Sequence, residues 1–216
     1  MKELAHSRGR FKGLSHERKD FLLKNAVQII GQHFSYGVSV SVNINEFKRN
    51  APKFVRGFRE AYPFCCHLAM TALVSLCRKH GDLESIHYIF EAGHAFQAEA
   101  EYLVGIAAMT DETKAFYRYN GHSFLSKNDA TPLQAADLLA WETAKFKDET
   151  LDSKMRDIRR SMLALFTAAP KKYSIHHCEG ASLARHLTRV RKAAAEQVIE
   201  EAVWKGIRER INATRR

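Results

Sequence analysis

The sequence contains no feature that would place the chain in a membrane. No apolar run reaches the roughly 18 to 20 residues needed to span a bilayer. The opening residues, Met1–His6, lack the apolar stretch of a signal peptide. Internal repeats and low-complexity segments are also missing. We therefore expect a cytoplasmic protein without a membrane partner.

Cysteines are few, and none of their spacings is a zinc-binding pattern. Cys65, Cys66 and Cys77 lie in one apolar helical stretch, Cys178 stands alone near the C-terminus, and no CxxC pair occurs. We expect reduced thiols in the core. The segment 176–178 places two histidines beside a cysteine, but adjacent residues of one loop rarely converge on a metal without a third ligand, so zinc is not expected there.

Acidic residues are in the minority. The chain has 34 Lys and Arg against 24 Asp and Glu, a formal net charge of +10. Apolar residues make up 45% of the chain and charged residues 27%, which indicates a folded protein. Its 216 residues suffice for one domain with an appendage. The charge favours a polyanionic partner such as nucleic acid, the alternative being a basic protein that has no such partner.

The first half of the chain predicts a helix, a strand and a second helix. Ser15 can cap a helix over residues 16–32. Large residues alternate with small polar ones from Phe34 to Ile44, which is the clearest strand pattern in the sequence. Pro63 opens an apolar helix that is expected to end near residue 80, with Gly81 as its C-terminal stop.

The middle of the chain repeats this alternation. We expect a strand over 86–91, a helix over 96–109, a turn at Asn120–Gly121 and a third strand over 122–126. Strands separated by helices of this length indicate an α/β fold with a parallel sheet. In such sheets, sites form beyond the carboxyl ends of the strands.

One acid, Asp137, interrupts an apolar helix. Thr131 suits the N-cap, Pro132 the first helical position, and Gln134 the position that a capping box fills with Glu or Gln. A buried carboxylate without a partner destabilises the folded state by several kcal/mol, on the order of the desolvation penalty of an ion. Asp137 is therefore expected to be paired, hydrogen-bonded or bound to a metal ion.

Two further acids are expected at the same edge of the sheet. Glu91 ends the second strand, and Asp129 follows the third. Each has an alternative role: Glu91 could cap the next helix or pair with an arginine, and Asp129 could be an ordinary turn residue. Asp137 could instead make a buried hydrogen bond to the backbone or to Ser126.

From about residue 151 the pattern predicts helices alone. One basic amphipathic helix is expected over 153–166 and a longer one over 181–211. Residues 185–216 carry nine Lys or Arg against four Glu, so this face could follow a phosphate backbone. The alternatives are a solvated helix packed on the core and a surface for homo-oligomer formation.

Three segments resemble the domain-of-unknown-function 3800 family, which is regarded as having a ribonuclease H-like fold. They are MKELAHSRGRFKGLSHERKDFL, IHYIFEAG and FLSKNDATPLQAADLLAW, and the resemblance covers roughly residues 1–147. It implies a three-layer α/β domain, a sheet with flanking helices, over residues 1–150, with a basic helical extension over 151–216 packed on it. The late family signature is met by Ser126, Leu133, Gln134, Ala136, Asp137 and Leu138.

The family's opening strand, which carries Asp-Glu-Ser-Gly, has no counterpart in this sequence. Glu3 would match a later acid of the family, and Met1 an internal methionine. We therefore expect an N-terminally truncated fold and a chain that starts late.

The resemblance implies a metal-dependent nuclease, in which Mg²⁺ or Mn²⁺ ions between carboxylates activate water and stabilise the leaving oxygen. The candidate ligands and catalytic residues are Glu3, Glu91, Asp129 and Asp137. Without the acid of the first strand, the affinity for metal ions is expected to fall. The sequence therefore does not decide whether the chain is an active enzyme or an inactive one. The alternative is a non-catalytic nucleic-acid- or protein-binding module of a mobile-element or defence system.

Overall fold

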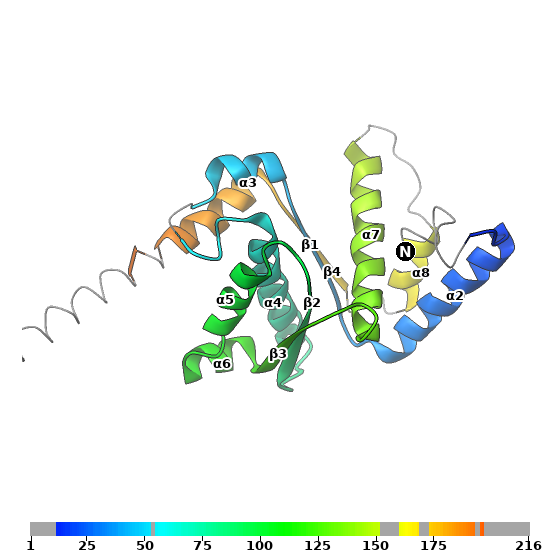
Figure 1. Cartoon of the computed structure of the whole chain (residues 1–216), viewed down its shortest axis with the longest axis horizontal. Helices are drawn as coiled ribbons and strands as arrows, with labels where there is room; N and C mark the ends of the chain where they lie inside the picture. The colour runs from blue at the N-terminus through cyan, green and yellow to red at the C-terminus, as the bar shows by residue number, and fades with distance from the viewer. Residues whose placement is uncertain (1–11, 53–54, 152–159, 169–172, 193–194, 197–216) are drawn as a thin grey trace, which may run out of the picture.

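The computed structural model describes residues 12–52, 55–151, 160–168, 173–192 and 195–196. They form a mixed α/β fold in which parallel strands lie between helices (Figure 1). No helix within these ranges is both long enough and apolar enough to cross a membrane.

Helices and short strands alternate along most of the chain, as the sequence predicts. A helix without a label spans 180–192. In chain order the labelled elements are α2 (His16–His33), β1 (Gly37–Val42), α3 (Ile44–Asn50), α4 (Ala61–Lys79), β2 (Ile86–Glu91), α5 (Gln97–Ile106), α6 (Asp111–Tyr117), β3 (Tyr119–Leu125), α7 (Thr131–Leu151), α8 (Arg160–Ala168) and β4 (Tyr173–Cys178).

The described strands pair as two separate two-stranded sheets. β1 lies parallel to β4, and β2 lies parallel to β3. Figure 1 shows the β1–β4 pair running between α4 on one side and α7 on the other. Parallel pairs need crossover connections, which the intervening helices supply. The α/β class with parallel strands is therefore confirmed.

Local chemistry explains the elements that the sequence predicts well. The Ser15 side chain accepts a hydrogen bond from the Arg18 N–H at 3.2 Å and caps α2. The apolar helix expected from Pro63 is α4, which ends at a cap formed by His80. Gly81 follows with a φ of 72°, a left-handed conformation that glycine adopts at little cost.

The strand expected over 34–44 is shorter at both ends than the alternation suggests, since β1 begins at Gly37. β1 ends at Val42, and Ile44 begins α3 instead. The cause is Asn43, whose side-chain oxygen accepts from the N–H groups of Asn45 and Glu46 and so begins a helix.

The turn expected at Asn120–Gly121 is wrong, because both residues lie within β3. The chain turns earlier, at Arg118, which has a left-handed φ of 53° and ends α6. α6 was not predicted; it begins with a capping box in which Thr110 and Thr113 exchange hydrogen bonds.

The expectation of helices alone after residue 151 is also wrong. Residues 173–178 form β4, which extends the β1 edge along its whole length. The strand was missed because its sequence, Tyr-Ser-Ile-His-His-Cys, has no regular aliphatic alternation. Tertiary contacts hold it instead: the Nδ1 atom of His177 lies 2.8 Å from the Ser41 hydroxyl on β1. The C-terminal third therefore supplies a strand of the sheet as well as helices.

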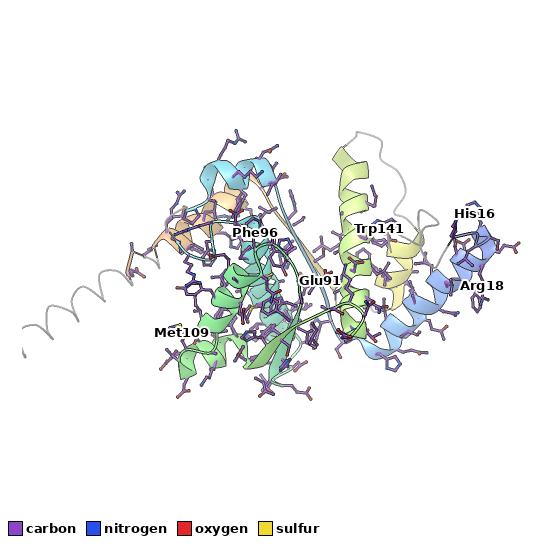
Figure 2. The ribbon with its side chains drawn as sticks, viewed as in Figure 1. His16, Arg18, Glu91, Phe96, Met109 and Trp141 are labelled. Atoms are coloured by element: carbon purple, nitrogen blue, oxygen red, sulfur yellow. The ribbon has the colours of Figure 1, made fainter. Side chains whose placement is uncertain are left out.

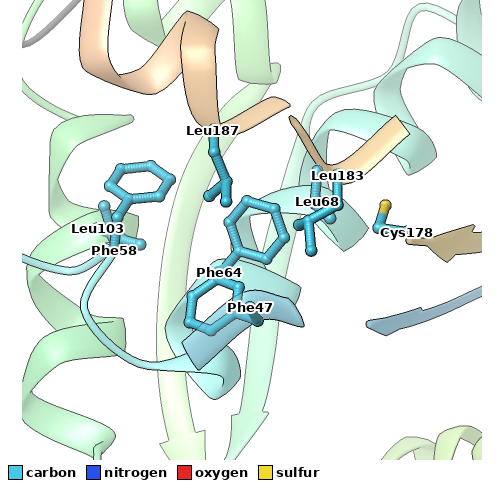
Figure 3. Close-up of a cluster of buried hydrophobic side chains, with 8 residues drawn as sticks. All are labelled: Phe47, Phe58, Phe64, Leu68, Leu103, Cys178, Leu183 and Leu187. Atoms are coloured by element: carbon cyan, nitrogen blue, oxygen red, sulfur yellow. The ribbon is translucent and has the colours of Figure 1, made fainter. Parts of the chain in front are cut away.

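Within the described residues, the buried side chains form three separate clusters. The largest joins α3, α4, β4 and the helix at 180–192, and Figure 3 shows its side chains converging on Phe64, which is 0% exposed. The second lies between α4, α5 and β2, and the third between α2, α7 and α8. An ordinary domain of this size has one contiguous core. The largest cluster contains Phe47, Phe58, Phe64, Leu68, Leu103, Cys178, Leu183 and Leu187.

Candidate functional site

The ends of β2 and β3 meet at one edge of their sheet. Glu91, the last residue of β2, is in register with Leu125, the last residue of β3. Lys127 follows two positions after β3, and Asp137 lies in the second turn of α7. Figure 2 shows Glu91 between the β2–β3 pair and α7. Parallel pairing thus brings side chains from three elements together.

A single ammonium group joins the two predicted acids. The Lys127 Nζ atom lies 3.2 Å from Glu91 Oε1 and 3.3 Å from Asp137 Oδ1. The side chains are 39%, 50% and 40% exposed, so the cluster faces solvent on one side. Two carboxylates on one ammonium carry a net negative charge that attracts a further cation.

The charge of Lys127 is stabilised by this arrangement. Partial burial alone would lower its pKa, but the hydrogen bond to Glu91 and the negative charge of Asp137 outweigh that effect and raise the pKa above its ordinary value of 10.5. Lys127 therefore carries a full positive charge at neutral pH and holds the two carboxylates in place.

Asp129, the third predicted acid, belongs to the loop and not to the ammonium cluster. Its Oδ2 atom accepts a hydrogen bond from the Ser126 hydroxyl at 2.7 Å, and the same hydroxyl oxygen accepts from the Asn128 N–H at 3.2 Å. These bonds fold the chain between β3 and α7 into a tight turn, as the turn alternative predicts. Glu3, the fourth predicted acid, lies outside the described residues.

Two details of the α7 prediction need correction. Gln134 does not act in a capping box: its side-chain amide donates to the Lys127 carbonyl at 3.1 Å and fixes the loop that carries that lysine. Asp137 is paired, as predicted, but it is only half-buried. Among the acids of this helix whose side chains the structure describes, Glu142 is completely buried, at 0% exposure, and the sequence pattern did not single it out.

The structure brings together two of the four predicted metal ligands. Within the described ranges, no group of three or more His, Cys, Asp or Glu side chains could hold a metal ion. Glu91 and Asp137 offer the carboxylate oxygens that Mg²⁺ and Mn²⁺ prefer, and the Lys127 ammonium lies between them. A divalent ion would have to move that ammonium aside.

A cavity of about 530 Å³ opens beside the carboxylates, which help to line it. Most of its other lining is apolar, and Tyr62 is one of several residues that bring a hydroxyl group to it. Burial raises the pKa of Tyr62 well above its ordinary value of 10, and the neighbouring Cys66 and Glu91 add to this effect. The phenol is therefore a neutral hydrogen-bonding group in this cavity.

The cavity also contains two thiols that are poor nucleophiles. Burial raises the pKa of Cys65 to about 12 and that of Cys66 to about 11. Thiolates carry the reactivity of cysteine, so neither side chain is suited to covalent catalysis at neutral pH. Both fit the prediction of cysteines that pack in the interior.

No protein-family model matches this chain, and no curated protein or solved structure has significant similarity to it.

Proposed function

We propose that this chain is a nucleic-acid-processing protein with a ribonuclease H-like fold that cleaves phosphodiester bonds with the help of Mg²⁺ or Mn²⁺. The observation that supports the proposal best is the shared ammonium: Glu91 and Asp137, from different elements, both contact Lys127 at the carboxyl end of a parallel strand pair. Sites of α/β proteins form at this edge.

Each residue of the cluster has a distinct part. Glu91 and Asp137 supply oxygen ligands and a negative field that attracts cations. Without a bound metal ion, the Lys127 ammonium group neutralises part of this negative charge. If a metal ion displaces the ammonium group from the carboxylates, Lys127 can contact a phosphate oxygen. A bound divalent ion would activate water and stabilise the leaving oxygen. The net charge of +10 supports a polyanionic substrate.

Metal binding by variants of the two acids tests the proposal. We expect the chain to bind Mn²⁺ in calorimetry, and both Asp137→Asn and Glu91→Gln to weaken that binding at least tenfold and to abolish cleavage of a labelled oligonucleotide. Glu101→Gln, an exposed acid on α5, is the matched control and should change neither property. Equal Mn²⁺ affinity in wild type and Asp137→Asn would refute the metal site.

A second function, a non-catalytic nucleic-acid-binding module, is favoured by a specific observation. Within the described residues only Glu91 and Asp137 converge, whereas two-ion catalysis uses more carboxylates. In this case oligonucleotide binding would be salt-dependent, no cleavage would occur with any metal, and Asp137→Asn would leave the affinity for the oligonucleotide unchanged.

A further inference from the structure

A second cavity lies on a different face of α4 from the one beside the carboxylates. It holds about 740 Å³ and is lined mainly by α4, β4 and the helix at 180–192. This volume is within the range of ligand pockets, about 300–1,000 Å³. None of Glu91, Lys127 and Asp137 lines it, so it is separate from the carboxylate cluster. We refer to this cavity as the α4 groove.

One stripe of α4 supplies polar side chains to the α4 groove. His67, Thr71, Ser75 and Lys79 recur every four residues, so they lie on one face of the helix. At a rise of ~1.5 Å per residue, the first and last of them are about 18 Å apart along the helix axis. The groove is therefore elongated, with an ionisable side chain towards each end and hydroxyl groups between them.

The helix at 180–192 supplies a second wall. Ser182, His186 and Arg189 line the groove from this helix. Leu183 and Leu187 on the same helix are each 1% exposed and pack with α4 in the largest core cluster, as Figure 3 shows. A buried apolar contact thus holds the two walls together, and the position of the basic side chains does not depend on an ionic partner.

The free edge of β4 also faces the α4 groove. All residues from Tyr173 to Cys178 line the groove, although successive side chains of a strand point to opposite faces. Such continuous lining places the backbone of β4 along the groove. β1 pairs with one edge of β4, and no described strand pairs with the other. Its N–H groups are therefore donors for an acceptor in the groove.

The charge of the α4 groove is positive. No Asp or Glu is among the described residues that line it. Lys79 and Arg189 are exposed, and neither forms an ion pair with a described carboxylate. Glu179, which follows β4, contacts His177 instead, with 2.9 Å between its Oε2 atom and the ring Nε2 atom. A cavity lined by cations without carboxylates attracts anions.

Three histidines, one from each wall, lie in this positive field. Burial, then the positive charges of Arg189, Arg185 and His176, lower the pKa of His186 below its ordinary value of 6.5. Burial and the neighbouring His186 lower the pKa of His67 to about 4. The positive charges that disfavour protonation of these rings favour an anion bound beside them.

We propose that the α4 groove binds an extended chain of phosphate groups, with one phosphate beside His186 and Arg189 and another beside Lys79. Arginine and lysine are the usual partners of phosphate oxygens. A single phosphate ion contacts only one end of a groove of this length. The phosphodiester backbone of a nucleic acid and a linear polyphosphate share the required chemistry. The choice of a polyanion rests on the proposed function, but binding here requires no metal ion.

Polyanion binding in EDTA tests the α4 groove. The probes are an oligothymidylate, a linear polyphosphate of similar charge and inorganic phosphate. We expect both polyanions to bind at least tenfold more tightly than inorganic phosphate and to lose affinity steeply as salt is added. Tighter binding of the oligonucleotide identifies nucleic acid as the source of the phosphates, and equal binding identifies a phosphate chain without bases. Polyanions that bind no better than inorganic phosphate would overturn the proposal.

Variants that remove one charge each distinguish the groove from the net charge of the protein. We expect Lys79→Gln and Arg189→Gln each to weaken polyanion binding at least fivefold. Lys24→Gln, on the exposed face of α2, removes the same charge outside the groove and should change the affinity less than twofold. All of these side chains are exposed, and circular dichroism establishes that each variant is folded. Equal losses in the three variants contradict binding in the groove.

The ring of His186 locates the bound phosphate in the wild-type protein. A phosphate beside this ring should raise its pKa, which NMR titration measures with and without saturating oligonucleotide. An unchanged pKa excludes a phosphate at this end of the groove. Asp137→Asn should keep full polyanion affinity in EDTA. Loss of cleavage in Asp137→Asn therefore tests the nuclease proposal, and loss of binding in Arg189→Gln tests the groove independently.

Discussion

Arg118 donates a hydrogen bond of 2.9 Å to Asp82 and thereby joins the end of α6 to the loop that precedes β2. The arginine side chain is only 8% exposed, and its Nε and Nη1 atoms have no hydrogen-bond partner among the described residues. Asp82 is thus the main counterion of a buried guanidinium, in a turn where Arg118 itself adopts a left-handed φ.

Replacement of this counterion should alter stability at low pH. The hydrogen bond from Arg118, followed by one from the Glu84 N–H, lowers the pKa of Asp82 below its ordinary value of 3.8. The stabilisation is therefore complete above about pH 4 and is lost as the pH falls through the lower, folded-state pKa. We expect Asp82→Asn to lower the melting temperature at pH 7 and to flatten its dependence below pH 4. Asp20→Asn, on the exposed face of α2, should retain the wild-type profile.

His67 should make the protein sensitive to mild acid. Burial, reinforced by the nearby His186, lowers the pKa of His67 from 6.5 to about 4. The unfolded chain takes up a proton near pH 6.5 and the folded protein only near pH 4, so stability falls as the pH decreases between these values. The slope is at most about 1.4 kcal/mol per pH unit for one proton. Denaturant unfolding of His67→Gln should show a smaller loss over this range, and His33→Gln, an exposed control, should show the full loss.

Two glycines should respond in opposite directions to alanine. Gly121 in β3 has a φ of 142°, and a Cβ atom there would lie 2.8 Å from Nδ1 of His87 on the neighbouring strand. We expect Gly121→Ala to destabilise the fold by about 1–3 kcal/mol. Gly105 in α5 has open space around it, and Gly105→Ala should stabilise the helix by about 0.5–1 kcal/mol. Unfolding curves that move in the same direction would contradict this account.

The ion pair between Lys127 and Asp137 should be modest and dependent on salt. Both side chains are about two-fifths exposed, so we expect a double-mutant cycle of Lys127→Met and Asp137→Asn to give about 0.2–1 kcal/mol at low ionic strength. The value should shrink at 1 M salt, where the screening length is about 3 Å. A coupling energy that does not change with salt would show that the two side chains interact through packing instead.

Elements whose signals are local were predicted well from the sequence. α2 and α4 have their own start or stop residues, Ser15 and Gly81, and these act in the structure as expected. β4 could not be predicted in this way, because it pairs with β1, which is far away in the sequence, and its own residues show no strand alternation. α3 was not predicted, because the strand alternation of β1 continues as far as Ile44, the first residue of α3. The helix cap at Asn43 was therefore read as part of the strand.

The candidate site was predicted in part. Glu91 was singled out because it lies at the carboxyl end of a predicted strand, and Asp137 because it is an acid within an apolar helix. The structure brings both acids to the same ammonium. The lysine that joins them has no signal in the sequence, since a lysine in a polar loop is ordinary surface. Asp129 was predicted as a site residue because it follows a strand. The direction of its side chain depends on the hydrogen bond that it accepts from the Ser126 hydroxyl, which residue spacing in the sequence does not predict.

The pairing of β1 with β4 has a consequence for synthesis on the ribosome. Ser41 and His177, which face each other across this pair, are 136 residues apart in the chain. At translation rates of about 5–20 residues per second, β1 emerges on the order of 10 s before its partner exists. We therefore expect β1 to be exposed to aggregation until β4 has been synthesised, unless a chaperone binds it. Expression at reduced temperature should increase the recovered yield.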